Sequence, residues 1–289
     1  MSYVTWEDLI SMNSRAETND AVLELPRDYV AQDTGEVAWD RTRFPLDQAL
    51  AADTAPLPTT EQREGYYGPR HFAYWASGLR DYCQLLEWLE LHNIARRTLL
   101  DIGCATGRLI RHVHPGTTSG FAEVIGCDIN RAHVDWVRRH LSSNIRIFQN
   151  SSIPSLPIPD ASVDVITAFS VFTHIECFDT TWLMELRRIL RPGGVAWLTI
   201  HGERTWRDID PTWPLHSSLI THPDYHRYRA NAELPEERLV FRWGAEGPYR
   251  ANVFYSDAYI RRTWGRVLAI KDTFPTLPCF QEVIVLQKD

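Results

Sequence analysis

Two carboxylates stand at the ends of apolar segments, each beside a turn. Asp101 closes TLLD and shortly precedes a turn containing Gly103 and Gly107, and Asp128 closes VIGCD. A carboxylate at Asp101 would repel a pyrophosphate but attract the ammonium of an amino-acid group. Asp128 follows the turn by about 20 residues, where an acid is expected to accept from ribose hydroxyls. The pair indicates a ligand with an amino-acid part and a nucleoside part.

The turn itself reads GCATG from Gly103 to Gly107, which is not the G-x-G-x-x-G spacing of dinucleotide sites. Its glycines allow positive φ and close backbone approach, so amides of the turn and of a helix from Arg108 onward could face a polar ligand. Turn and acids together favour S-adenosylmethionine over NAD. In the alternative interpretation, the two acids only cap strands or form turns.

Two histidines could accept a proton. His174 follows one apolar run and His201 ends another. If the group that attacks the methyl is an alcohol, a histidine is the natural base because its pKa lies near neutrality. Either ring could instead orient a loop or contact a ligand. Glu176 and Glu203 could orient the histidines or help to bind a divalent cation such as Mg²⁺, or they could be solvated surface charges.

The elements that must position these residues follow from the apolar pattern. Strands alternate with helices, which indicates an α/β fold with a doubly wound sheet. Helices are predicted over residues 72–91, 108–114, 131–141, 181–190 and 257–264, the last with Ser256 as its N-cap. Strands are predicted from residue 98 and over residues 122–127, 145–150, 163–170 and 195–200, followed by two closing strands over 267–274 and 280–288.

The same pattern divides the chain into four segments. Residues 1–65 form an N-terminal arm with a Pro-containing linker over 53–60, and residues 66–200 form the cofactor-binding core. Residues 201–255 are rich in aromatic side chains and are predicted to be an inserted substrate cap, with a hairpin around 244–247. Residues 256–289 complete the core with a helix and two strands. The cap or the arm could also mediate a homodimer.

Composition excludes several other classes of protein. The net charge is −7 with no basic stripe, which argues against a nucleic-acid partner. No stretch approaches the roughly 20 apolar residues of a membrane span, and no secretory leader is recognisable, so a cytoplasmic location is expected. The five cysteines form no CxxC pair, which indicates reduced thiols rather than disulfides or a zinc site.

The chain resembles the class I S-adenosylmethionine-dependent methyltransferases from about residue 66 to residue 288. The resemblance is carried by LLDIGCATGRL, VIGCDIN, LPIPDASVDVITAFSVFTHI and ELRRILRPGGVAWLTIHG, in family order and spacing. It implies a Rossmann-like sheet of seven mostly parallel strands with the last strand antiparallel. It also implies that the ends of the first three strands bind the cofactor, while the fourth and fifth strands face the substrate.

The resemblance implies roles for individual residues. Asp101, Gly103 and Gly107 would hold the methionine part of S-adenosylmethionine, and Asp128 with Ile129 the ribose and adenine. Many relatives carry an acid where Ser152 stands, and Ala105 replaces the middle glycine of their turn. The full set of implied cofactor contacts is Asp101, Gly103, Cys104, Gly107, Asp128, Ile129, Asn150, Ser151, Ser152, Ile153 and Ser170.

A narrower resemblance, in SVFTHI, WLMELRRILRPGG, LTIHG and YSDAYIRRTWG, is to bacterial methyltransferases associated with saccharides and the cell envelope. It implies O-methylation of a hydroxyl on a saccharide or polysaccharide precursor, such as a mannoside. The alternative is N- or O-methylation of a specialised small-molecule metabolite. A third hypothesis is a catalytically silent fold that binds the cofactor or its product, S-adenosylhomocysteine, and serves as a partner for another protein.

Overall fold

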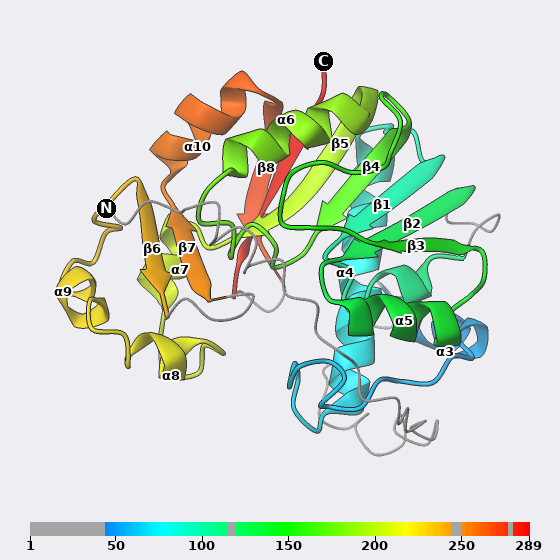
Figure 1. Cartoon of the computed structure of the whole chain (residues 1–289), viewed down its shortest axis with the longest axis horizontal. Helices are drawn as coiled ribbons and strands as arrows, with labels where there is room; N and C mark the ends of the chain where they lie inside the picture. Colours follow the sequence, from blue (N-terminus) through cyan, green and yellow to red (C-terminus); the bar gives the residue numbers. More distant parts are fainter. Residues whose placement is uncertain (1–43, 115–119, 244–249, 277–279) are drawn as a thin grey trace. The chain divides into compact units, whose positions relative to one another are not determined.

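The computed structural model describes residues 44–114, 120–243, 250–276 and 280–289 (Figure 1). The chain divides after Asn150 into two compact units. We call described residues 44–150 the N-terminal unit and described residues 151–289 the C-terminal unit. No helix in the described ranges is long and apolar enough to cross a membrane.

The N-terminal unit carries three parallel strands. Strands β1 (Thr98–Ile102), β2 (Glu123–Asp128) and β3 (Ile145–Gln149) pair in register, with β2 in the middle. Every residue of β1 is buried, as expected for a strand covered on both faces. Its helices are α3 (Leu46–Ala52), α4 (His71–Leu91) and α5 (Arg131–His140), with a short 3-10 turn η1 (Ile110–His112).

The glycine turn is not followed by an α-helix, which corrects the helix predicted over residues 108–114. Only η1 forms there. The apolar positions of this segment are buried, but Pro115 and Gly116 follow at once, and a segment of this length is too short to sustain an α-helix without further support. The amides that could face a ligand are therefore those of the turn, not those of a helix N-terminus.

The segment predicted as a linker over residues 53–60 is attached to the core of its unit. The Asp53 carboxylate accepts from Trp75 Nε1 at 2.7 Å and from Arg111 Nε at 2.6 Å, and all three side chains are buried. Burial would raise the pKa of Asp53, but the Arg111 guanidinium lowers it below its usual value. Leu57 packs in the same cluster as Trp75.

Replacing Asp53 with asparagine should lower the free energy of unfolding by about 3 kcal/mol, because it leaves a buried guanidinium without its counter-charge. Urea unfolding at neutral pH measures this loss. Asp208→Asn is the matched control, since its 3.5 Å pair with Arg204 is half-exposed and should contribute less than about 1 kcal/mol. Equal losses in the two variants would contradict a structural role for the Asp53 ion pair.

The C-terminal unit carries the remaining elements. Its strands are β4 (Val163–Ala168), β5 (Leu190–Ile200), β6 (Arg238–Arg242), β7 (Ala251–Tyr255), β8 (Ala269–Pro275) and β9 (Glu282–Gln287). Its helices are α6 (Asp179–Ile189), α7 (Glu203–Asp208), α8 (His216–Leu219), α9 (Tyr225–Arg229) and α10 (Asp257–Thr263), followed by the 3-10 turn η2 (Trp264–Arg266). Ser256 is the N-cap of α10, as predicted, because its hydroxyl accepts from Tyr259 N at 3.1 Å.

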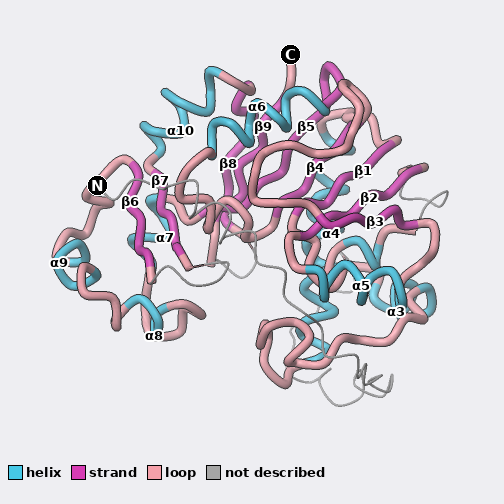
Figure 2. Tube along the Cα trace, in the orientation of Figure 1, coloured by secondary structure: helices cyan, strands magenta, loops and turns pink. Residues whose placement is uncertain are grey.

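The sheet order is β3-β2-β1-β4-β5-β9-β8. β4 and β5 pair in parallel, whereas β9 pairs antiparallel with both β5 and β8. The predicted α/β fold with seven mostly parallel strands and an antiparallel last strand is thus confirmed. Figure 2 shows the strands in magenta and the helices in cyan along the chain trace.

Residues 201–255 form the helices α7, α8 and α9 and a separate two-stranded sheet of β6 and β7. The two strands are antiparallel and pair Arg238 with Tyr255 at one end and Arg242 with Ala251 at the other. The turn predicted around residues 244–247 lies outside the described residues. An aromatic cluster that includes Trp206, Trp213 and Phe241 packs beside these strands.

Candidate functional site

The glycine turn has the backbone conformation that its sequence predicts. Gly103 and Gly107 have φ of +66° and +78°. A Cβ on Gly107 would lie 2.4 Å from Leu141 Cδ1, so a larger residue would meet both backbone strain and a clash. Ala105, in the place of a glycine, also has a left-handed conformation, with φ of +48°.

Asp128 connects this turn to the end of β2. Its carboxylate accepts from Ala105 N at 2.8 Å and from Asn130 N at 2.7 Å, and the residue is 1% exposed. Backbone donors therefore fix both carboxylate oxygens. Asp101 is likewise buried, near the end of the neighbouring strand β1. The structure thus brings the turn and the two predicted acids together in one unit.

Cys104 and Cys127 lie beside these acids and are both buried. Burial raises the pKa of each thiol well above its usual value, and the charges of Asp128 and Asp101 raise it further. A neutral, buried thiol is a weak nucleophile. The predicted contact of Cys104 with the cofactor is therefore one of packing or backbone, not of covalent chemistry.

Ile129 and Asn150 also lie at this end of the N-terminal unit. Asn150 N donates to Asp128 O at 3.1 Å, and Gln149 Nε2 donates to Ile129 O at 2.9 Å. The backbone that follows β3 is thus held against the backbone that follows β2. Gln149 was not predicted from the sequence, although its position at the end of a predicted strand was a signal for it.

The loop of residues 58–71 is a second feature that was not predicted from the sequence. Arg63, which is 3% exposed, donates to the carbonyls of Tyr66 and Pro58 at 2.7 and 2.9 Å and also to that of Gly68. The next residue, Glu64, accepts from Asn130 Nδ2 at 2.9 Å. The loop is therefore folded around one buried arginine and attached to the start of α5.

The remaining predicted cofactor contacts, Ser151, Ser152, Ile153 and Ser170, belong to the C-terminal unit. The Ser152 hydroxyl is buried and has no hydrogen-bond partner among the described residues, while its carbonyl accepts from Trp182 Nε1 at 3.2 Å. Ser170 has φ of +57° and bonds to the side chain of Gln281. Among these four residues, Ser152 is therefore the one whose buried hydroxyl could form a hydrogen bond to a ligand.

His174 lies in the loop between β4 and α6. Its Nδ1 is 2.7 Å from the carbonyl of Ala251. A carbonyl can only accept, so Nδ1 carries the hydrogen and Nε2 carries the lone pair. Burial lowers the pKa of His174, and the bond to Ala251 only partly offsets this. At neutral pH the ring is therefore neutral, in the tautomer that can accept a proton at Nε2.

The loop that carries His174 is fixed by β6 and β7. Val253 N donates to Thr173 O at 2.8 Å, and the Tyr255 hydroxyl lies 3.1 Å from the carbonyls of Phe172 and Ile175. A bidentate ion pair joins the side chains of Arg242 and Glu176, so Glu176 is neither a solvated charge nor directly bonded to His174. Sequence patterns gave no signal for these contacts.

His201 is 1% exposed and lies among aromatic rings. Its ring centroid is 5.2 Å from that of Trp213 and 5.0 Å from that of Phe254. Burial lowers its pKa to about 3, and the neighbouring His174 adds to this. His201 is therefore a neutral ring at physiological pH. Neither of its nitrogens has a hydrogen-bond partner among the described residues.

Two more buried polar atoms near these histidines lack partners in the described ranges, Thr173 Oγ1 and Asn252 Oδ1. Both residues neighbour groups already named, because Thr173 precedes His174 and Asn252 follows Ala251. Leaving a buried polar atom unpaired costs about 1–3 kcal/mol. Thr173, Asn252 and His201 each thus have a buried polar atom to which a bound ligand or water would supply the missing hydrogen bond.

The structure offers little for a metal ion. No group of three or more His, Cys, Asp or Glu side chains that could hold one occurs among the residues described. Glu203 accepts from Asp257 N at 3.1 Å at the start of α10, and Glu176 is paired with Arg242. Neither acid adopts the cation-binding role considered from the sequence, so Mg²⁺ has no support here.

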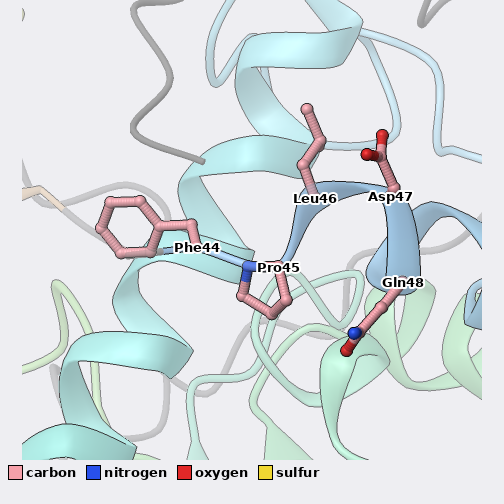
Figure 3. Close-up of a pocket in the computed structure, with 5 residues that line it drawn as sticks. All are labelled: Phe44, Pro45, Leu46, Asp47 and Gln48. Atoms are coloured by element: carbon pink, nitrogen blue, oxygen red, sulfur yellow. The ribbon is translucent and has the colours of Figure 1, made fainter. Parts of the chain in front are cut away.

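A separate pocket of about 240 Å³ lies at the start of α3, below the roughly 300–1,000 Å³ of small-molecule sites. It is lined by five consecutive residues, Phe44 to Gln48, whose side chains point in different directions (Figure 3). None of the predicted site residues lines it. We therefore do not assign it to the chemistry.

The comparisons with known proteins agree with this geometry. A family model described as a methyltransferase domain matches residues 99–194. A probable S-adenosylmethionine-dependent methyltransferase of Mycolicibacterium smegmatis is 38% identical over 108 residues, which are 36% of this chain and 38% of that protein. A sterol 24-C-methyltransferase of Gibberella zeae is 30% identical over 132 residues, 43% of this chain and 33% of that protein. The matched part spans less than half of each relative.

Among solved structures, geranyl diphosphate C-methyltransferase from Streptomyces coelicolor A3(2) matches with a TM-score of 0.48 and 15% identity, covering 83% of this chain and 88% of that one. An S-adenosylmethionine-dependent methyltransferase from Methanosarcina mazei matches with a TM-score of 0.47 and 17% identity, covering 69% and 96%. The fold is assigned from the strand order alone. The two matches to solved structures are not used for it. The family match covers β1, the glycine turn and β2, so residues 99–194 are similar to a methyltransferase domain.

Proposed function

We propose that this protein transfers a methyl group from S-adenosylmethionine to a hydroxyl of a neutral, polyhydroxylated acceptor, a saccharide or polysaccharide precursor such as a mannoside. The observation that supports a hydroxyl as the methyl acceptor is the tautomer of His174. The Ala251 carbonyl fixes this tautomer by accepting from Nδ1, which leaves the lone pair on Nε2. An alcohol needs such a base, because its proton must leave as the oxygen attacks.

The residues of the N-terminal unit fit the cofactor. Asp101 supplies a buried carboxylate for an ammonium group, and Asp128 supplies one for ribose hydroxyls. A Cβ on Gly107 would clash with Leu141, which is consistent with a turn that packs closely. When bound, the cofactor supplies a methyl group made electrophilic by its positively charged sulfur.

His174 performs the proton transfer in this proposal. Its Nε2 accepts the hydroxyl proton as the acceptor oxygen bonds to the methyl carbon and the carbon–sulfur bond breaks. The products are a methyl ether, S-adenosylhomocysteine and a protonated imidazole, which returns its proton to solvent. Alignment of the oxygen with the methyl group and exclusion of water provide the rest of the rate gain.

The charge balance around His174 favours a neutral acceptor. Thr173 and Asn252 are uncharged, and His201 is neutral because of its low pKa. The one acid of the loop, Glu176, is neutralised by Arg242. Uncharged hydrogen-bonding groups favour a ligand that carries hydroxyls, because a ligand without them leaves these protein groups unpaired, at a cost in binding free energy. The resemblance of this segment to saccharide-associated methyltransferases supports the same class of acceptor.

A panel of matched acceptors tests the proposal. The protein is incubated with methyl-labelled S-adenosylmethionine and with methyl α-mannoside, its amino-sugar analogue and its uronic acid, with Mg²⁺ or with a chelator. We expect label in the neutral sugar, unaffected by the chelator. Label only in the amine would instead favour N-methylation of a small metabolite. No turnover with these acceptors or with a fractionated bacterial extract would favour a catalytically silent protein.

The rate should depend on pH through His174. The base works in its neutral form, and its pKa lies below the ordinary value of 6.5. The rate constant should therefore reach half of its maximum below pH 6.5, level off by about one pH unit above that midpoint, and fall as the pH drops below it. Single-turnover rates with saturating cofactor between pH 5 and pH 8 measure the profile. A rate that still rises between pH 7 and pH 8 would contradict a base with a lowered pKa.

A further inference from the structure

His133 lies between two carboxylates that belong to distant parts of the N-terminal unit. Its Nδ1 is 3.5 Å from Asp128 Oδ1, and its Nε2 is 3.9 Å from Glu64 Oε1. The ring is on the first turn of α5 and is 5% exposed, whereas the Glu64 side chain is 48% exposed. We call Glu64, His133 and Asp128 the acid–histidine–acid cluster.

The contacts of the cluster are ion-pair contacts rather than ordinary hydrogen bonds. Neither ring nitrogen of His133 has a hydrogen-bond partner at normal geometry among the described residues. Apart from the two acids, Asn130 and the Gln62 backbone lie near the ring or its partners, and they carry no charge. A protonated ring would therefore be attracted to a carboxylate on each side, while a neutral ring would lose most of both attractions.

The protonation state of His133 follows from these neighbours. Burial alone would lower the pKa of His133, but the carboxylates of Asp128 and Glu64 raise it above its ordinary value. A histidine with a raised pKa is substantially protonated at the lower end of the physiological pH range. It loses that proton as the pH rises.

Both acids are attached to parts of the proposed cofactor site. Asp128 is fixed by the amides of Ala105 and Asn130, and it is the acid expected to accept from the ribose. Glu64 bonds to Asn130 and belongs to the loop of residues 58–71, where Glu64 and Tyr67 have positive φ of 55° and 64°. Glu64 is thus held in a backbone conformation that a non-glycine residue adopts only when its surroundings favour it.

We propose that His133 and Glu64 are positioning residues for the cofactor, in that the protonated imidazole joins the loop of residues 58–71 to the ribose-binding carboxylate and so strengthens nucleoside binding. The inference rests on the proposed use of this site for S-adenosylmethionine. It adds His133 and Glu64, which lie outside the glycine turn and the strand ends, to the residues proposed to act on cofactor binding. It also gives cofactor binding a pH dependence distinct from that of His174, which acts on the rate.

Titration of S-adenosylhomocysteine into the wild-type protein between pH 5.5 and pH 8 tests the proposal by calorimetry. We expect the affinity of the wild-type protein to fall by about threefold to tenfold over this range as His133 loses its proton. Glu64→Gln and His133→Gln should bind more weakly than the wild type at pH 5.5 and should show a smaller dependence on pH. Titration of groups on the ligand is common to all variants and cancels in the comparison.

His140→Gln is the matched control, because His140 ends the same helix and packs on Trp136. It should keep the wild-type pH dependence. The His133 ring signal in NMR spectra of the ligand-free protein gives a second readout, with a pKa above 6.5 that falls in Glu64→Gln. Because Glu64 is half-exposed, that variant remains informative even if His133→Gln fails to fold.

The possible outcomes separate the two proposals. Wild-type pH dependence in both Glu64→Gln and His133→Gln would overturn the positioning role while leaving the cofactor site intact. An ordinary or lowered pKa for His133 would overturn it as well. Absence of binding by the wild-type protein at every pH would overturn the proposed cofactor site, and the positioning role with it.

Discussion

Asp101→Asn should weaken the binding of S-adenosylhomocysteine by about 30-fold to 5,000-fold. Asparagine has nearly the same shape but no charge, so an ammonium group enclosed at the end of β1 would lose its counter-ion. Removing one partner of a buried charge pair costs about 2–5 kcal/mol. Calorimetric titration of the purified variant at neutral pH measures the loss.

The control for this substitution is Glu123→Gln. Glu123 begins β2, and its 3.7 Å pair with Arg146 is half-exposed, so its loss should change the affinity by less than about fivefold. Circular dichroism should show that both variants are folded. Binding by Asp101→Asn within twofold of the wild type would mean that Asp101 only supports the strand end, which was the alternative interpretation of its position.

His174→Gln should lower the rate of methyl transfer by about 100-fold to 10,000-fold, the usual contribution of a general base. Glutamine can still donate a hydrogen bond to the Ala251 carbonyl but cannot accept a proton at neutral pH. The affinity for S-adenosylhomocysteine should stay within twofold, because the contacts assigned to the cofactor do not include His174. Single-turnover rates with the acceptor identified in the panel measure the effect.

Two further variants show whether the loss belongs to His174 itself. His226→Gln changes an exposed histidine on α9 and should leave the rate unchanged. Tyr255→Phe removes the hydroxyl that contacts Phe172 and Ile175 and should lower the rate by less than His174→Gln, while the acid limb of the pH profile remains. A wild-type rate in His174→Gln would show that another group accepts the proton.

Much of the fold could be predicted because the residues that determine each strand, turn and cap lie close together in the sequence. The strand β1 is predominantly apolar, with Leu99, Leu100 and Ile102, and it is buried throughout, as is typical of a strand covered on both faces. Ser256 is a cap because a hydroxyl at that position satisfies an amide of the first turn of α10. The glycine turn was recognisable because Gly103 and Gly107 are the residue types that positive φ requires.

The contacts that complete the site could not be predicted in this way. Asp53 and Arg111 are 58 residues apart, Glu64 and Asn130 are 66 apart, and the Tyr255 hydroxyl reaches a carbonyl 83 residues away. Nothing in the local pattern around each residue indicates its partner, since the partner is chosen by how the elements pack. The assignment of His201 as a base depended on its place at a strand end, whereas its environment, and hence its low pKa, depends on Trp213 and Phe254.

The proposed reaction is transfer of a methyl group from S-adenosylmethionine to a hydroxyl, with His174 as the base. The most direct measurement is to supply cofactor with a ¹³C-labelled methyl group and the accepted sugar, and to follow the labelled carbon by NMR with wild-type protein and His174→Gln. We expect the label to appear as a methyl ether with the wild type and at least about 100-fold more slowly with the variant. Label on nitrogen or carbon, or an equal rate in the two proteins, would contradict it.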